Sequence, residues 1–266
     1  MSTNPHGIKV IFFDIDGTLF SHTQMAIPQS ARDALAEVRA NGVKTVIATG
    51  RHKVDLQSLP TADMEFDGYL ALNGMMILDK SMQLISGTAI DPDECKILSL
   101  AFRAKKIPFL ILTEDGRYMN YINELAQHGI DTGEYTLPDP VDDFKRNGRP
   151  IFQLCAFVNA EQRQLLDDIL EGCDITSWSE TGIDIVPKGG GKVSGIKHYI
   201  EAEGIDQSET MAFGDGENDV EMLAFAGIGV AMGNGVEDAK AAADYVTTSV
   251  DEDGIANGLR HFGLID

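Results

Sequence analysis

The segment that most constrains this chain is residues 9–19, which read Lys-Val-Ile-Phe-Phe-Asp-Ile-Asp-Gly-Thr-Leu. Its β-branched and aromatic run is typical of a strand buried on both faces, as in a parallel sheet. The run ends in Asp14 and Asp16, followed by Gly17. Two such carboxylates repel each other and are costly to desolvate, and a bound cation is the simplest way to hold them there. Because ligands bind at the carboxyl ends of parallel strands, this segment predicts an active site.

The Asp-x-Asp-Gly pattern has two simpler interpretations. An EF-hand calcium loop requires glycine at its sixth position and glutamate at its twelfth, and these positions hold Leu19 and Met25. The EF-hand is therefore excluded. The other interpretation is an Asp-Gly turn with one capping carboxylate, and the polar clusters elsewhere in the chain speak against it.

Other apolar strands also end in polar and glycine residues. We expect strands at 43–48, 69–72, 210–213 and 228–232. They are followed by Thr49-Gly50-Arg51, Asn73-Gly74, residues 214–219 and Gly233-Asn234-Gly235. Between the first strands, Ser30 and Asp33 have the spacing of a capping box and Gly42 marks a helix end. This alternation predicts an α/β fold with a Rossmann-like parallel-sheet core and one functional edge.

The middle of the chain has a different pattern. Hairpin signals, such as Glu114-Asp115-Gly116 between two apolar runs, alternate there with predicted helices. Residues 131–150, rich in proline, glycine and charge, are predicted to form a loop. We therefore expect an inserted α+β cap domain over residues 84–187 and a core domain formed by residues 1–83 and 188–266.

The balance of charge limits the partners of the chain. Its 266 residues include 21 basic and 42 acidic side chains, for a formal net charge of -21. Such a charge opposes binding to nucleic acid or to an anionic membrane, so neither partner is expected. It also repels anionic substrates at long range. A phosphate site must therefore rely on local lysine and arginine side chains, backbone amides and a metal.

The cysteines and the N-terminus indicate the compartment. Cys95, Cys155 and Cys173 form no CxxC pair and have no histidine cluster nearby, which favours reduced thiols over structural zinc. Residues 1–7 are polar and do not resemble a signal peptide, and no apolar run approaches a membrane span. We expect a soluble cytoplasmic protein. The sequence does not indicate an oligomeric state.

Three polar groups accompany the first aspartates: Thr49-Gly50-Arg51, Lys192, and Asp215 with Asn218 and Asp219. Each has an ordinary alternative, since threonine caps helices, most lysines are solvated, and acidic residues favour helix N-termini. Together with Asp14 and Asp16 they supply four carboxylates, a hydroxyl, an ammonium and several glycines. This set suits magnesium, which prefers hard oxygen ligands, together with a phosphoryl group.

Competing phosphate motifs do not fit. Gly214-x-Gly216 is followed by Asp219 where a dinucleotide fingerprint has its third small residue. Gly191-Lys192 lacks the upstream glycine and the following serine or threonine of a P-loop. The chain has neither a nucleophile-elbow serine nor an HExxH motif.

The motifs resemble, in chain order, the four motifs of the haloacid dehalogenase superfamily. They are Asp14-Ile15-Asp16-Gly17-Thr18-Leu19, Ala48-Thr49-Gly50-Arg51, Lys192, and Gly214-Asp215-Gly216-Glu217-Asn218-Asp219. Asn73-Gly74 and the long insert resemble the Cof-type phosphatases of this superfamily, whose class IIB cap determines substrate specificity. One departure concerns the third motif, where the usual Lys-Gly is Lys192-Val193. Lys192 is favoured for this role over Lys188.

The resemblance implies a role for each motif residue. Asp14 is the nucleophile, and Asp16 is the general acid and base. Magnesium is held by the Asp14 carboxylate, the Asp16 backbone carbonyl and Asp215. Phosphate and substrate contacts come from Thr49, Gly50, Arg51, Asn73, Gly74, Lys192 and Asn218. Asp219 orients the residues around the metal, and the cap excludes water and contacts the leaving group.

The function that the resemblance implies is a magnesium-dependent phosphomonoesterase with an aspartyl-phosphate intermediate. Its substrate would be a small phosphorylated metabolite, with sugar phosphates first and nucleotide or cofactor phosphates second. A sugar phosphomutase of the same superfamily is the alternative within enzymes. A non-catalytic protein that binds a phosphorylated metabolite is the alternative from another class, although such a binder has no use for an acid beside a nucleophile.

Overall fold

The structure is a computed structural model that describes residues 4–56, 61, 63–131, 139–140, 148–177 and 181–266. The chain forms two compact units. The first unit comprises Met1–Ser86 and Gly191–Asp266, and the second unit comprises Gly87–Gly190. The sequence predicted each boundary three residues earlier. At the first boundary the difference arises because the strand after Gln83 belongs to the sheet of the first unit.

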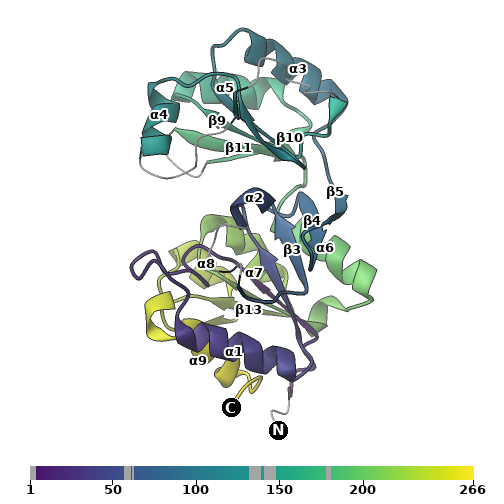
Figure 1. Ribbon diagram of the computed structural model, residues 1–266, viewed down its shortest axis with the longest axis vertical. Coiled ribbons are helices and arrows are strands. Elements are labelled where there is room, and N and C mark those ends of the chain that lie inside the picture. Colours follow the sequence, from purple (N-terminus) through teal and green to yellow (C-terminus); the bar gives the residue numbers. More distant parts are fainter. Residues whose placement is uncertain (1–3, 57–60, 62, 132–138, 141–147, 178–180) are drawn as a thin grey trace. The chain divides into compact units, whose positions relative to one another are not determined.

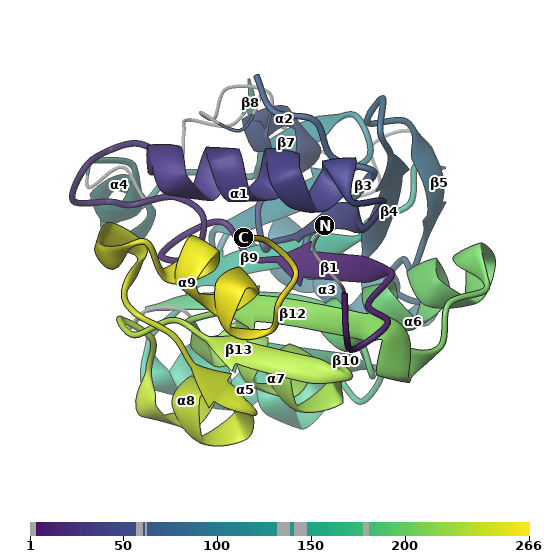
Figure 2. The same cartoon turned by 90° about the horizontal axis from the view of Figure 1, so that it is seen from below.

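A mixed sheet with parallel strands at its centre forms the first unit (Figures 1 and 2). Its strand order is β14-β13-β12-β1-β2-β3-β4-β5. The strands from β14 to β3 are parallel, and β4 is antiparallel to β3. Their bounds are β1 Val10–Phe13, β2 Lys44–Ala48, β3 Gly68–Ala71, β4 Met76–Asp79, β5 Leu84–Gly87, β12 Thr210–Gly214, β13 Ile228–Ala231 and β14 Tyr245–Val246. The predicted α/β fold is confirmed.

Helices cover both faces of this sheet, and Figure 2 shows the two layers. Helices α1 (Gln29–Ala40) and α9 (Gly254–His261) lie on one face. The other face carries α6 (Lys192–Glu203), α7 (Val220–Phe225) and α8 (Glu237–Ala242). The short α2 (Lys53–Leu56) follows β2. Within the described residues, no helix combines the length and hydrophobicity that a membrane crossing requires.

The central strand β1 is buried on both faces, as its composition predicts. Every residue of β1 has 0 % exposure. Val10 and Phe12 belong to the core cluster that includes residues of α6 and α7. Phe13 stacks on Phe213 of the neighbouring β12 with ring centroids 5.3 Å apart. Burial of such large apolar side chains, each contributing about 1.5–3 kcal/mol, fixes the strand whose end carries Asp14.

The start of α1 differs from the prediction. The helix begins at Gln29 after Pro28, so Ser30 lies inside its first turn and is not the cap. The Ser30 hydroxyl donates instead to Asp253, 2.5 Å away, and the predicted capping box is wrong. Proline fixes the backbone just before the helix, which moves its start toward the N-terminus. The predicted end is correct, since Gly42 follows α1 with a φ of 85° that favours glycine.

A second sheet, with strand order β10-β11-β9-β6-β7-β8, forms the second unit. Its strands are β6 Phe109–Thr113, β7 Gly116–Met119, β8 Asp139–Pro140, β9 Gln153–Phe157, β10 Cys173–Ser177 and β11 Gly182–Pro187. Helices α3 (Pro92–Arg103) and α5 (Ala160–Ile169) pack against it through a shared apolar core. Helix α4 (Glu124–Asp131) was not predicted. Most of the predicted loop 131–150 lies outside the described residues, but its described part at Asp139–Pro140 pairs with β7 as strand β8 and is not loop.

Candidate active site

The carboxyl ends of the parallel strands bring the motif residues of the first unit together. Phe13 of β1 pairs with Ile47 of β2 and with Phe213 of β12, so these strands end level with one another. Asp14 follows β1 and donates its backbone N–H to the Phe213 carbonyl at 3.0 Å. Asp215 follows β12 directly. The strand ends thus meet at one edge, as the sequence predicts.

Lys192, the first residue of α6, lies between two aspartates from different motifs. Its Nζ donates to Asp14 Oδ1 and to Asp219 Oδ1, each at 2.6 Å. All three side chains are buried. Lys188 lies elsewhere, and its Nζ donates to the Glu171 carbonyl at 3.0 Å. Of the two candidate lysines, Lys192 is therefore the one beside Asp14.

Asp219 also orders the loop that carries Asp215. Its Oδ2 accepts the backbone N–H groups of Asp215 and Gly216, each at 2.9 Å. Both oxygens of Asp219 are thus engaged, one by the ammonium of Lys192 and one by backbone amides. A carboxylate held in this way links the lysine to the Asp215 loop.

The pKa values of the carboxyl groups at this edge are shifted by burial and by neighbouring charges, most of which are negative. Burial raises the pKa of Asp14 to about 8, against the attraction of Lys192. Burial likewise raises the pKa of Asp215 to about 6, although the hydrogen bond from Thr18 acts in the other direction. Burial by itself would lower the pKa of Lys192, but attraction to Asp14 and Asp219 outweighs it and raises the pKa.

The residues at this edge fit a divalent cation. Carboxylate oxygens of Asp14, Asp215 and Asp219 lie within 4.8 Å of one another. Three carboxylates and one ammonium, that of Lys192, leave a local charge of -2 when all four groups are ionised. A divalent ion balances this charge, and carboxylate oxygens are the hard ligands that magnesium prefers.

Gly17 and Thr18 shape the approach to Asp215. A Cβ atom on Gly17 would lie 2.2 Å from Asp215 Oδ2, and the φ of Gly17 is 84°, so glycine is required there for two reasons. The Thr18 hydroxyl donates to Asp215 Oδ1 at 2.6 Å. The first and fourth motifs are thereby joined directly.

Asp16 is held by two basic side chains. Arg51 donates from Nε to Asp16 Oδ2 and from Nη2 to Asp16 Oδ1, both at 2.7 Å. His22 Nε2 lies 3.2 Å from Asp16 Oδ1. The hydrogen bond to Asp16 raises the pKa of Arg51. Arg51, which the sequence placed among the phosphate-binding residues, therefore directs its guanidinium at a carboxylate.

The remaining motif residues line the turns after β2 and β3. Thr49 is buried, its Oγ1 accepts the backbone N–H of Arg51 at 3.1 Å, and its carbonyl accepts the N–H of Asn73 at 2.9 Å. Asn218 Nδ2 donates to Asn73 Oδ1 at 3.2 Å. Gly50 and Gly74 lie in the same two turns. Every site residue named from the sequence therefore lies at this one edge of the first unit.

A family model described as haloacid dehalogenase-like hydrolase matches residues 11–259, nearly the whole chain. The chain belongs to the haloacid dehalogenase-like hydrolases. The resemblance inferred from the four motifs, with its Cof-type character, is confirmed.

Relatives of this hydrolase are named as phosphatases. "Putative phosphatase YkrA" of Bacillus subtilis (strain 168) is 34% identical over 262 residues, which cover 97% of this chain and 98% of YkrA. The solved structure of the phosphatase BT1666 of Bacteroides thetaiotaomicron is 33% identical, with a TM-score of 0.88 over 100% of this chain and 98% of its own. The solved structure of BT4131, a subclass IIB sugar phosphatase, is 38% identical in sequence, with a TM-score of 0.84. The match covers 97% of this chain and 100% of the BT4131 chain. This hydrolase is a phosphatase.

Three residues at the edge were not predicted as part of the site of this hydrolase: Thr18, His22 and Asn234. Thr18 lies within the first motif, and Asn234 lies in the polar turn after β13 that the sequence places at the same edge. Asn234 Nδ2 donates to the Gly17 carbonyl at 2.8 Å. His22 lies within residues 18–27, which the sequence predicts to be an irregular link, and no pattern there could have revealed its contact with Asp16.

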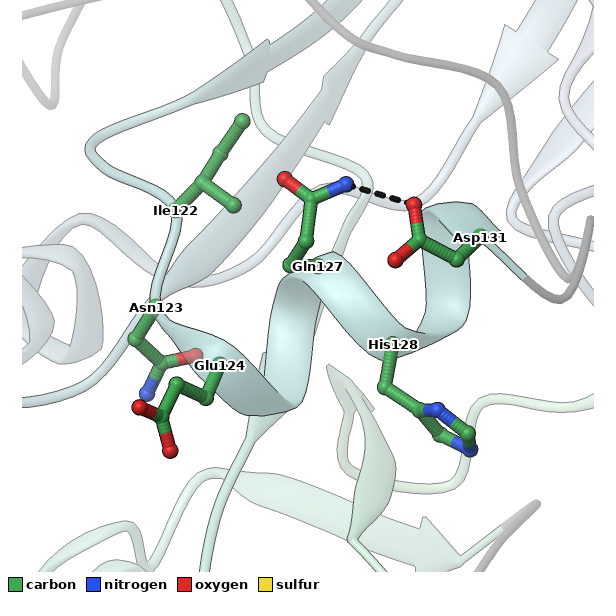
Figure 3. A pocket seen from close by; sticks show the side chains of 6 residues that line it. All are labelled: Ile122, Asn123, Glu124, Gln127, His128 and Asp131. Atoms are coloured by element: carbon green, nitrogen blue, oxygen red, sulfur yellow. Dashed lines mark hydrogen bonds between the residues drawn. The ribbon is translucent and has the colours of Figure 1, made fainter.

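The second unit of the hydrolase has a concavity at α4 and the two residues before it (Figure 3). Its volume is about 590 Å³. Within it, Gln127 Nε2 donates to Asp131 Oδ1 at 2.8 Å. The residues that line it are Ile122, Asn123, Glu124, Gln127, His128 and Asp131. Amide, carboxylate and imidazole groups of this kind can exchange hydrogen bonds with hydroxyl groups.

Proposed function

We propose that this phosphatase is a magnesium-dependent phosphomonoesterase that acts on a small phosphorylated metabolite. The observation that carries the proposal is the position of Lys192, 2.6 Å from Asp14 and from Asp219, with Asp215 beside them. This arrangement combines a nucleophile, a fixed positive charge and oxygen ligands for a cation. Phosphoryl transfer requires these components, because its catalysis consists mainly of positioning and charge stabilisation.

Asp14 begins the reaction as nucleophile. One of its carboxylate oxygens attacks phosphorus in line and forms a P–O bond, while the bond from phosphorus to the ester oxygen breaks. Asp16 donates a proton to the departing alkoxide, which leaves as an alcohol. The product on the enzyme is an acyl phosphate at Asp14.

Asp16 then completes the cycle as a base. It takes a proton from a water molecule whose oxygen attacks the same phosphorus, and the P–O bond to Asp14 breaks. Inorganic phosphate leaves, and both aspartates return to their initial state. Arg51 keeps the Asp16 carboxylate in one orientation through two parallel hydrogen bonds, which limits the rearrangement between the two steps.

Lys192 and the turn residues bind the phosphoryl group. The Lys192 ammonium offsets the negative charge on Asp14 and on the phosphoryl oxygens. The Thr49 hydroxyl and the backbone amide of Gly50 supply donors at the neighbouring strand ends. The cation would be held by Asp14, the Asp16 backbone carbonyl and Asp215, and when bound it compensates charge on the phosphoryl oxygens. Asp219, with both oxygens engaged, orients this arrangement.

Sugar phosphates are the first substrate class under this proposal. The likeness to the sugar phosphatase BT4131 over almost the whole of both chains supports them. Release of inorganic phosphate from sugar, nucleotide and cofactor phosphates, ranked by kcat/KM, tests the order. A nucleotide or cofactor phosphate at the head of the ranking would overturn the assignment to sugars.

Hydrolysis of p-nitrophenyl phosphate tests the reaction itself. We expect turnover in Mg²⁺, none in EDTA, and none in the Asp14→Asn variant, which is nearly isosteric but not nucleophilic. Absence of turnover with every phosphate ester would indicate a non-catalytic binding protein. Phosphate release from a sugar monophosphate that depended on an added bisphosphate would instead indicate a phosphomutase.

A further inference from the structure

The turn after β13 packs against the backbone that carries Asp215. The Val236 N–H donates to the Asp215 carbonyl at 2.8 Å, and the Met232 N–H donates to the Gly214 carbonyl at 2.9 Å. Asn234 lies between these two anchor points. Its side chain is thereby presented to the edge of the sheet where Asp14 and Asp215 lie.

The side-chain amide of Asn234 has a defined orientation. Its Oδ1 accepts the Val250 N–H at 2.8 Å, so its Nδ2 must point the other way. There Nδ2 donates to the Gly17 carbonyl at 2.8 Å and lies 3.5 Å from Asp215 Oδ2. Both of these groups are acceptors, and only the NH2 end of an amide can satisfy them.

The two groups that Asn234 contacts belong to the segments that carry the proposed cation ligands. Gly17 directly follows Asp16, whose backbone carbonyl is one proposed ligand, and Asp215 is another. Thr18 already binds Asp215 Oδ1, so Asn234 is the donor on the side of Oδ2. The segments at Thr18 and Asp215, which are 197 residues apart in the chain, are therefore joined directly at Oδ1 and through Asn234 at Oδ2.

We propose that Asn234 is a positioning residue for the divalent cation, which fixes the Gly17 and Asp215 segments relative to each other through its single NH2 group. The inference rests on the proposed cation-dependent function. Asn234 itself does not touch the phosphoryl group. Because the side chain is exposed, water competes for its hydrogen bonds, and we expect a loss of about three- to tenfold in cation affinity when they are removed.

Binding of Mn²⁺ in the absence of substrate tests this role, with the free ion measured by electron paramagnetic resonance. Two variants of the full chain are compared with the wild type: Asn234→Leu, which keeps the side-chain shape, and Asn234→Ala, which does not. The control is Asn257→Leu. Asn257 Nδ2 also makes two hydrogen bonds, to Thr248 Oγ1 and to the Glu252 carbonyl, without contact to Asp215 or Gly17.

We expect both Asn234 variants to bind Mn²⁺ about three- to tenfold more weakly, with melting temperatures in EDTA close to that of the wild type. Asn257→Leu should bind Mn²⁺ like the wild type. Unchanged Mn²⁺ affinity in the Asn234 variants, with or without a lower melting temperature in EDTA, would overturn the inference alone. A wild-type chain that binds no Mn²⁺ would overturn the proposed cation site and the inference together.

Discussion

A Cβ atom placed on Gly195 would lie 2.7 Å from the Cα of Gly74, so the first turn of α6 touches the turn after β3 directly. Lys192 begins the same helical turn. The close approach of these two glycines therefore sets the position of the lysine beside Asp14. It also accounts for the glycine at 195, where any Cβ atom would meet the backbone of Gly74.

Replacement of Gly195 by alanine tests this contact, because the contact decides whether the free energy of unfolding rises or falls. In an open helix, glycine to alanine stabilises by about 1 kcal/mol. Here we expect Gly195→Ala to lower the free energy of unfolding by about 1–3 kcal/mol, because the backbone of Gly74 cannot yield. Denaturant unfolding measures the change, and phosphate release should fall in parallel. A more stable variant with full activity would show that the two turns are free to separate.

Arg51 is predicted to act on Asp16 more than on the substrate. Arg51→Lys keeps the positive charge but loses the planar pair of donors that holds both Asp16 oxygens. We expect kcat to fall by about 10- to 100-fold with KM changed by less than about threefold, since the orientation of the acid is lost and binding is not. Steady-state kinetics with p-nitrophenyl phosphate separates the two constants. A large rise in KM at constant kcat would mean that Arg51 binds the phosphate group of the substrate, as the sequence predicts.

Divalent cations are predicted to raise the melting temperature of the chain. A ligand that binds only the folded state at about 100 times its Kd stabilises it by about 2.7 kcal/mol. We expect Mg²⁺ to raise the midpoint of thermal unfolding by several degrees in the wild type and by none in Asp215→Asn. Asp238→Asn, an exposed carboxylate on α8, is the matched control and should respond like the wild type. An equal shift in all three proteins would place the ion outside the Asp14–Asp215 edge.

Asp115 in the second unit is predicted to make stability depend on acid pH. Its carboxylate accepts from Thr113 at 2.7 Å and pairs with Arg149. Burial would raise the pKa of Asp115, but these partners outweigh it and hold the pKa at about 2. A depressed carboxyl pKa stabilises the fold above the ordinary value of 3.8, and this stability is lost as the pH falls toward 2.

Thermal unfolding of Asp115→Asn across pH measures this contribution. The variant should melt below the wild type at pH 6, and the difference should shrink as the pH falls below about 4. Asp168→Asn, an exposed carboxylate on α5, serves as the control and should show no such convergence. A difference that stays constant down to pH 2 would mean that Asp115 acts through packing and not through its charge.

The sequence was sufficient to predict the strands at the active edge, because each is a short apolar run that ends in polar and glycine residues. It could not predict how the side chains after those strands pair. Arg51 turns toward Asp16, and Thr18 reaches Asp215, through contacts that depend on tertiary packing and leave no local pattern. Helix α4 was missed because it is only one short segment with a glycine, Gly129, in its interior. The start of α1 was misplaced because Pro28 outweighed the capping signal of Ser30.

The position of β1 between β2 and β12 has a consequence for the synthesis of the protein. One edge of β1 can pair as soon as residues 44–48 have been translated, but the other waits for residues 210–214. A nascent chain therefore carries Asp14, the proposed nucleophile, after an apolar strand with an open edge while the second unit is being made. An unpaired edge of this kind can pair with other chains, so β1 is open to incorrect pairing until residues 210–214 have been made.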